Sequence, residues 1–186
     1  GAFCQRRYRD LLFHPPIAQV KPGETVCIHT LDAFENKMTP EVEKFADVCT
    51  YPFLNPQTGP IVVEGAEPGD TLVVQIHEIE PTRDHAVTGS IPYFGGLTST
   101  RLDPTLQEAL EEQWLFLPLE EGGVRFDEKR LIPYEPFMGT IGVAPEIEAV
   151  NALTPDYYGG NMDCVETRPG NEVWFPVLVE GALFFT

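Results

Sequence analysis

Glu67-Pro68-Gly69-Asp70-Thr71-Leu72-Val73-Val74-Gln75-Ile76 is the stretch that decides the fold class of this chain. A Pro-Gly turn, in which the glycine can adopt a positive φ, leads through an acid into a β-rich run. The same order recurs at residues 21–26 and, more loosely, at residues 168–173. The spacings between the three copies are unequal, so they form a recurring turn-to-strand device and not a solenoid repeat.

The run that follows this turn alternates in polarity. Leu72, Val74 and Ile76 share one face, which predicts a strand with one buried and one mixed face. Similar runs occupy residues 25–30, 60–64, 124–126 and 172–175. The 18 prolines and 16 glycines exclude long helices. We therefore predict a mainly β, sandwich- or barrel-like fold over residues 1–186, either as a single domain or as two subdomains with a seam near residues 99–124.

One or two short helices are expected within this β-rich chain. Asp103 can cap a helix, Pro104 suits its first position, and Leu106 and Leu110 lie four residues apart. This helix would end near Trp114. By the same logic, a second helical turn would begin at residues 39–41.

Composition restricts the class of partner. The 29 acidic residues outnumber the 12 basic ones, and a net charge of −17 disfavours nucleic acids and anionic membranes. No apolar run approaches the roughly 20 residues that span a bilayer. None of the four cysteines lies within three residues of another, so we expect reduced thiols and a cytoplasmic location. A small neutral substrate is the easiest to reconcile with this charge.

Chemistry is most plausible at Gly159-Gly160-Asn161-Met162-Asp163. Glycines before an amide and an acid permit a tight turn that aims backbone N–H groups at an oxyanion or carbonyls at a metal. Asp163 would then be a metal ligand or a general base, and Asn161 would bind a substrate carbonyl. The alternative is a plain Gly-Gly turn with Asn161 and Asp163 in local backbone-capping roles. No Gly-x-Ser-x-Gly or His-Glu-x-x-His motif offers a competing site.

Asp32 is a second candidate. It follows the predicted strand at residues 25–30 and is flanked by apolar residues. A metal ligand and a turn-capping residue are both consistent with this position.

Several segments, taken together and in order, resemble the acetamidase/formamidase family from about residue 15 to the end of the chain. The resemblance implies a mostly β amidase that hydrolyses formamide, acetamide or a similar short amide to a carboxylate and ammonia. The matching segments are Thr30-Leu31-Asp32-Ala33-Phe34, residues 55–70 (Asn55-Pro56-Gln57-Thr58-Gly59-Pro60 onward), residues 136–145, Tyr158-Gly159-Gly160-Asn161-Met162-Asp163, Pro176-Val177 and Gly181-Ala182-Leu183-Phe184.

The resemblance also implies site residues. Asp32 and Asp163 are the expected ligands of a divalent metal, zinc rather than calcium, and Asp163 and Asn161 are the expected catalytic residues. Tyr158, Gly159 and Gly160 would line the substrate site, while the segment around Glu64 would serve the fold more than the chemistry. We further expect a homodimer or a higher homo-oligomer.

Two departures from the family pattern bear on these expectations. Tyr158 stands where some members carry a histidine directly before Gly-Gly-Asn-Met-Asp. The sequence also stops at Thr186, where members continue into a Gly-Asp-x-His segment, so the chain resembles the N-terminal two-thirds of a member. We therefore keep two hypotheses: a metal-assisted amidase, and a non-catalytic β-sandwich that binds a ligand or serves assembly.

Overall fold

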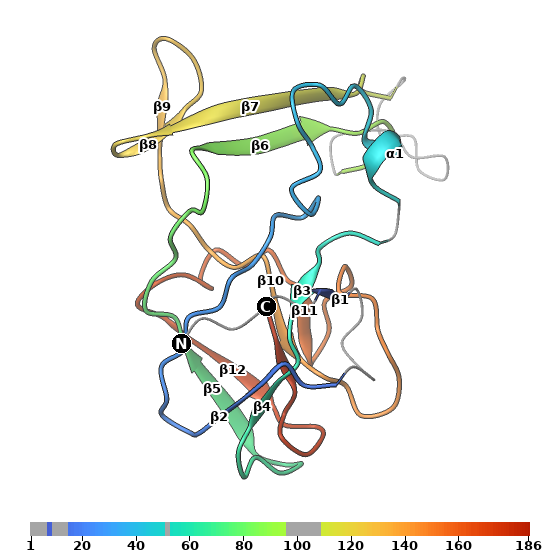
Figure 1. Cartoon of the computed structure of the whole chain (residues 1–186), viewed down its shortest axis with the longest axis vertical. Coiled ribbons are helices and arrows are strands. Elements are labelled where there is room, and N and C mark those ends of the chain that lie inside the picture. Colours follow the sequence, from blue (N-terminus) through green and yellow to red (C-terminus); the bar gives the residue numbers. More distant parts are fainter. Residues whose placement is uncertain (1–6, 9–14, 51–52, 96–108) are drawn as a thin grey trace. The chain divides into compact units, whose positions relative to one another are not determined.

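The computed structural model describes residues 7–8, 15–50, 53–95 and 109–186, which belong to two compact units (Figure 1). The first unit combines residues 1–37, 49–79 and 136–186, and the second combines residues 38–48 and 80–135. The chain therefore passes between the units several times. The seam near residues 99–124 stays a prediction.

The first unit is organised around a five-stranded sheet with the order β11-β10-β13-β4-β2. Only β2 and β4 run parallel; the other neighbouring strands are antiparallel. Two smaller sheets pair β1 with β3 and β5 with β12. The strands of this unit are β1 (Arg7–Tyr8), β2 (Ala18–Val20), β3 (Gln57–Thr58), β4 (Ile61–Val63), β5 (Thr71–Gln75), β10 (Thr140–Val143), β11 (Gly159–Asn161), β12 (Glu172–Pro176) and β13 (Phe184–Phe185).

The middle of the five-stranded sheet is the centre of the core. Phe184 of β13 pairs with Ile61 on one side and with Val143 on the other, and all three side chains are buried. Phe185 is fully buried. Burial of each such side chain stabilises the fold by about 1.5–3 kcal/mol. The core therefore holds β10 and β11 in place, and these strands carry Thr140 and Asn161.

The three predicted Pro-Gly turns are confirmed. Gly23, Gly69 and Gly170 have φ values of +82°, +102° and +90°. In each turn the residue after the glycine donates its N–H to the carbonyl three residues earlier, at 3.0 to 3.2 Å. Two turns lead into strands, β5 and β12, which pair with each other. The predicted strand at residues 25–30 is wrong, because there only Cys27 forms an isolated bridge. A turn is closed by local contacts, whereas a strand also needs a partner along its length.

The predicted faces of β5 are confirmed. Leu72 and Val74 are half-buried and Ile76 is buried, while Val73 and Gln75 are exposed. The strand ends at Gln75, although the β-rich run continues in the sequence to residue 79. Its partner β12 begins at Glu172, opposite Gln75, so the end of the pairing sets the end of the strand.

The second unit contains a four-stranded antiparallel sheet in the order β6-β7-β8-β9, together with a four-residue helix. Its elements are α1 (Phe45–Val48), β6 (His85–Ser90), β7 (Gln113–Glu120), β8 (Gly123–Arg125) and β9 (Leu131–Pro133). The aromatic ring of Phe45 stacks on that of Trp114, with ring centroids 6.3 Å apart. Within the described part of the chain, no helix is long and apolar enough to cross a membrane.

The helix predictions were less accurate than the strand predictions. Residues 103–108 lie outside the described residues, and the predicted end near Trp114 is wrong because Trp114 belongs to β7, opposite Gly89. Pairing with β6 overrides the local spacing of leucines. Residues 39–41 form a turn closed by the N–H of Val42 on the carbonyl of Thr39, and the helix begins later, at Phe45. The mainly β class is confirmed, and the sheets in the described ranges are open, with no closed barrel.

Candidate functional site

The glycine pair begins β11, and Gly159 also closes a tight turn at residues 156–159. Gly159 and Gly160 have φ values of +95° and +105°, which few other residues tolerate. β11 runs alongside β10 with Gly159 opposite Gly142. A Cβ atom on Gly159 would lie 2.4 Å from the carbonyl oxygen of Ile141. The main requirement for glycine here is therefore the close approach of the β10 and β11 backbones.

Backbone donors of this segment are already used within the fold. The N–H of Gly159 donates to the carbonyl of Asp156 at 2.9 Å, and that of Asn161 donates to the carbonyl of Ala152 at 2.8 Å. The N–H of Gly159 is thus engaged within the fold, and oxyanion donation by backbone N–H groups near Gly159 and Gly160 stays a prediction.

Tyr158 lies in the hydrophobic core and is only 5% exposed. Its hydroxyl donates to the carbonyl of Thr154 at 3.2 Å. Burial, with a smaller contribution from the negative charge of Asp156, raises the pKa of Tyr158 above its ordinary value. The ring therefore supports β11 from the core side, and a contact of Tyr158 with a substrate stays a prediction.

Asn161 belongs to a hydrogen-bonded cluster of side chains from three separate segments. The Nδ2 group of Asn55 donates to Oδ1 of Asn161 at 2.8 Å and to Oγ1 of Thr140 at 3.0 Å. The hydroxyl of Thr140 in turn donates to Oδ1 of Asn161 at 2.9 Å. The NH2 group of Asn161 faces Asp163, and its Nδ2 atom donates to Oδ2 of Asp163 at 3.3 Å. We call Asn55, Thr140, Asn161 and Asp163 the amide–carboxylate network.

Asp163 ends this network at the surface. Its side chain is exposed, and its backbone has a φ of +47°, a region that Asn and Asp tolerate better than most residues. Its N–H donates to the carbonyl of Gly139 at 3.0 Å. A Cβ on Gly139 would lie only 3.0 Å from Oδ1 of Asp163, so the glycine leaves room for the carboxylate. Asp163 therefore combines an exposed carboxylate with a sparsely populated backbone conformation, and such conformations gather at functional sites.

Asp32 has a clear local role. Its Oδ1 accepts the N–H groups of Phe34 at 3.0 Å and Asn36 at 2.7 Å, and so stabilises the turn at residues 33–36. The carbonyl of Ala33 in this turn accepts the N–H of Asn55 at 3.0 Å. The segment of Asp32 is therefore connected through Asn55 to the amide–carboxylate network. The turn-capping alternative accounts for the contacts of Oδ1 of Asp32. A role of Asp32 in metal binding stays a prediction.

The side chains around Asp32 and Asp163 limit the kind of metal ion that they could hold. In the described residues, no three His, Cys, Asp or Glu side chains are grouped so that they could hold one. Catalytic zinc takes three protein ligands as a rule. Oδ1 of Asn161 already accepts two hydrogen bonds, so it is a poor additional ligand. Zinc held by Asp32 and Asp163 would therefore need a further ligand, and metal binding by these two residues stays a prediction.

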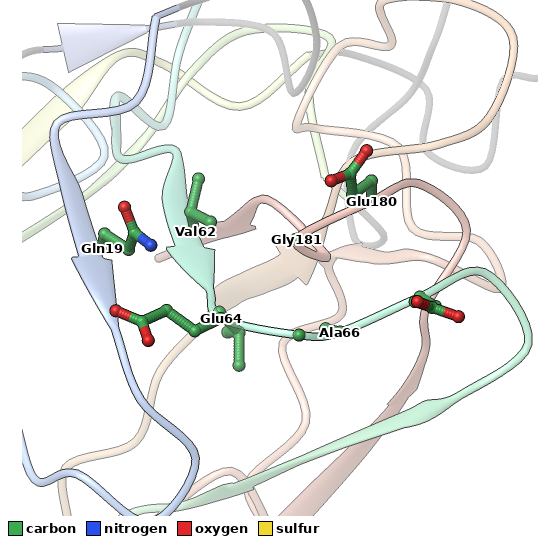
Figure 2. A pocket seen from close by; sticks show the side chains of 9 residues that line it. Gln19, Val62, Glu64, Ala66, Glu180 and Gly181 are labelled. Atoms are coloured by element: carbon green, nitrogen blue, oxygen red, sulfur yellow. The ribbon is translucent and has the colours of Figure 1, made fainter.

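A separate surface feature is a pocket of about 480 Å³ in the first unit (Figure 2). Gln19 of β2 and Val62 of β4 line it, together with Glu64, Glu67 and Glu180. Figure 2 shows Glu64 directly after β4, and the expectation that its segment serves the fold more than the chemistry stays a prediction. Asp32 and the amide–carboxylate network do not line this pocket.

Sequence reasoning found two members of the network and missed two. Asn161 and Asp163 were predicted, whereas Asn55 and Thr140 were not singled out, although both lie in segments that carry the family resemblance. Thr140 lies two residues before Gly142, which pairs with Gly159, and this register brings it opposite Asn161. A local signal for the pairing of Asn55 with these strands does not exist in the sequence.

Comparisons with known proteins point in one direction. The family model described as "Acetamidase/Formamidase family" matches residues 5–154. An acetamidase structure from Yersinia enterocolitica matches 96% of this chain with 37% identity and a TM-score of 0.89. An acetamidase structure from Bacillus halodurans matches 99% of the chain with 31% identity and a TM-score of 0.87.

The comparisons also differ in extent. The family match covers Asp32, Asn55 and Thr140, whereas the matches to solved structures also extend over most of the remaining chain, in which Asn161 and Asp163 lie. This chain spans 55% of the Yersinia enterocolitica protein and 60% of the Bacillus halodurans protein. It therefore corresponds to a little over half the length of these relatives.

Proposed function

Because this chain belongs to the acetamidase/formamidase family, we propose that it acts in the hydrolysis of a short neutral amide, such as formamide or acetamide, to a carboxylate and ammonia. The observation that carries the proposal is the amide–carboxylate network, which leaves an exposed carboxylate beside an amide NH2 group. These two groups complement an amide undergoing attack by water: one accepts a proton and the other donates to an oxygen.

Asp163 has the role of general base in this proposal. Its carboxylate accepts a proton from water as the water oxygen bonds to the carbonyl carbon. The carbonyl oxygen gains the negative charge, and an N–H of Asn161 donates to it. The C–N bond then breaks, and the nitrogen takes the proton from Asp163 and leaves as ammonia. The remaining carboxylic acid ionises in water, so atoms and charges balance.

A divalent metal, zinc in preference to calcium, stays part of the proposal through Asp32 and Asp163. The described residues do not supply a third His, Cys, Asp or Glu ligand, so the steps above use none of its chemistry. Calorimetric titration of the chain with zinc and calcium tests this part directly. Binding that survives Asp32→Asn and Asp163→Asn together would contradict the assignment of these ligands.

Ammonia release from formamide and acetamide tests the function as a whole. The assay should use the 186-residue chain and a polypeptide extended to the length of the relatives, each with added zinc and with a chelator. We expect turnover by at least one of them. If neither releases ammonia with metal present, while the folded chain binds an amide or another small ligand, the non-catalytic module becomes the better description.

Gly139→Ala gives a finer test of the position of Asp163. The backbone of Gly139 is not in the positive-φ region, so alanine is compatible with it. Its Cβ would press on Oδ1 of Asp163, and the exposed carboxylate would shift by a few tenths of an ångström. We expect kcat to fall about tenfold, because displacement by an ångström can cost about 100-fold. Thermal unfolding should show a loss of stability below about 1 kcal/mol; unchanged kcat would contradict the assigned role.

A homo-oligomeric assembly and a cytoplasmic location complete the proposal. The acidic composition is compatible with both, and so are the sheet edges that are open within the described residues, such as that of β2. Light scattering coupled to gel filtration measures the oligomeric state, and a monomer at micromolar concentration would contradict the first part.

A further inference from the structure

We propose that Asn55 and Thr140 are positioning residues, which together orient the carboxamide of Asn161 so that its NH2 group faces Asp163. The inference deepens the proposed function and rests on it, because Asn161 and Asp163 are the groups that would act on the amide. It assigns a role to two residues that lie far from Asn161 along the chain.

The hydrogen-bond inventory leaves one orientation for Asn161. Nδ2 of Asn55 has two N–H donors, one for Thr140 Oγ1 and one for Asn161 Oδ1. The hydroxyl of Thr140 has one donor, and it points to the same Oδ1 atom. Oδ1 of Asn161 thus receives two donors at 2.8 and 2.9 Å, which satisfies both of its lone pairs. Rotation of the carboxamide by 180° would place NH2 against these donors.

Asn55 is itself held firmly enough to direct another side chain. Its N–H donates to the carbonyl of Ala33, and its carbonyl accepts Nε2 of Gln57, both at 3.0 Å. Gln57 is 3% exposed, so this second contact is shielded from water. The φ of Asn55 is +53°, a left-handed conformation that asparagine tolerates well. A rigid supporting contact of this kind is what keeps a reactive group in its working geometry.

The orientation has a chemical consequence. With Oδ1 saturated, Asn161 offers only N–H groups to Asp163 and to a ligand. The network is therefore suited to a hydrogen-bond acceptor, such as the carbonyl oxygen of an amide, next to a carboxylate that can accept a proton. In the opposite orientation two acceptors, Oδ1 of Asn161 and Oδ2 of Asp163, would face each other.

Asn55→Asp tests the inference with almost no change of shape. The substitution replaces both N–H donors by an oxygen that repels Oδ1 of Asn161, so we expect the carboxamide to rotate and donate to the introduced carboxylate. The side-chain NH2 signals of Asn161 in ¹H–¹⁵N spectra, assigned by their absence in Asn161→Asp, should move downfield and exchange more slowly with solvent. Turnover of the amide should fall about 100-fold, the loss typical of a removed oxyanion donor.

Asn171→Asp is the matched control. Nδ2 of Asn171 donates to the carbonyl of Glu166 outside the network, so this variant adds the same charge without touching Asn161. Its Asn161 signals should stay at the wild-type position. If the Asn161 signals are the same in Asn55→Asp as in this control, the positioning role is overturned.

Thr140 supplies an independent pair of variants in case Asn55→Asp does not fold. Thr140→Val removes the hydroxyl at similar volume, and Thr140→Ser keeps it. We expect Thr140→Val to shift the Asn161 signals and to lower kcat about tenfold. Thr140→Ser should keep the signals at the wild-type position and kcat within about twofold of wild type. Equal signals in the two variants would overturn the inference. Shifted signals without amide turnover by any protein, wild type included, would instead refute the proposed function and leave the positioning role intact.

Discussion

Asp163→Asn should reduce amide turnover by about 100- to 10,000-fold, the range expected when a general base is removed. Asparagine has nearly the same shape and tolerates the left-handed φ of +47° at this position. It retains an oxygen that can accept from Nδ2 of Asn161, so the network keeps its connections. The side chain is exposed, and we expect the free energy of unfolding to change by less than about 0.5 kcal/mol.

The control for this prediction is Asp70→Asn. Asp70 is also exposed, and its carboxylate accepts the backbone N–H of Glu67 at 3.0 Å, but it lies in a Pro-Gly turn outside the network. Both variants remove one negative charge from the first unit. Ammonia release should be lost in Asp163→Asn and kept in Asp70→Asn. Wild-type turnover by Asp163→Asn would remove Asp163 from the mechanism, whatever the fate of the control.

Gly159→Ala should have the largest effect on stability, a loss of about 4 kcal/mol or more in the free energy of unfolding. A Cβ atom at this position would lie 2.4 Å from the carbonyl oxygen of Ile141 and 2.8 Å from the Cα of Gly142, both backbone atoms of β10. Backbone atoms inside a paired sheet cannot move aside as a side-chain end can. A positive φ adds about 1 kcal/mol for alanine. Domains are stable by only about 5–15 kcal/mol, so partial unfolding is expected.

Gly170→Ala separates the cost of the positive φ from the cost of the clash with β10. Gly170 has a similar φ, +90° against +95°, but no heavy atom lies within 4 Å of its would-be Cβ. This variant should lose only about 1 kcal/mol, the conformational cost alone. Urea unfolding followed by far-UV circular dichroism measures both. Equal losses for the two variants would show that the approach of β10 and β11 is looser than the structure has it.

The regions where prediction succeeded share a physical feature: their structure is decided by neighbours in sequence. The turns at Gly23, Gly69 and Gly170 form because proline fixes one φ and glycine permits the next, and their closing hydrogen bonds span three residues. The alternation of Leu72, Val74 and Ile76 also follows from the geometry of an extended chain. Errors occurred where a remote partner decides, as at Trp114, which joins β7 because β6 lies beside it.

The candidate site divides in the same way. The sequence by itself determined the fold class and the three Pro-Gly turns, and the family resemblance singled out Asn161 and Asp163 as candidate site residues. Only the tertiary structure decided that Gly159 is needed for strand packing, and that Asn55 and Thr140 orient Asn161. The contacts of Asn55 join residues 85 and 106 positions apart, and no local pattern encodes a hydrogen bond over that distance. The register of β10 on β11 and the anchoring of Asn55 create this arrangement, because they bring three polar side chains together where their donors and acceptors match.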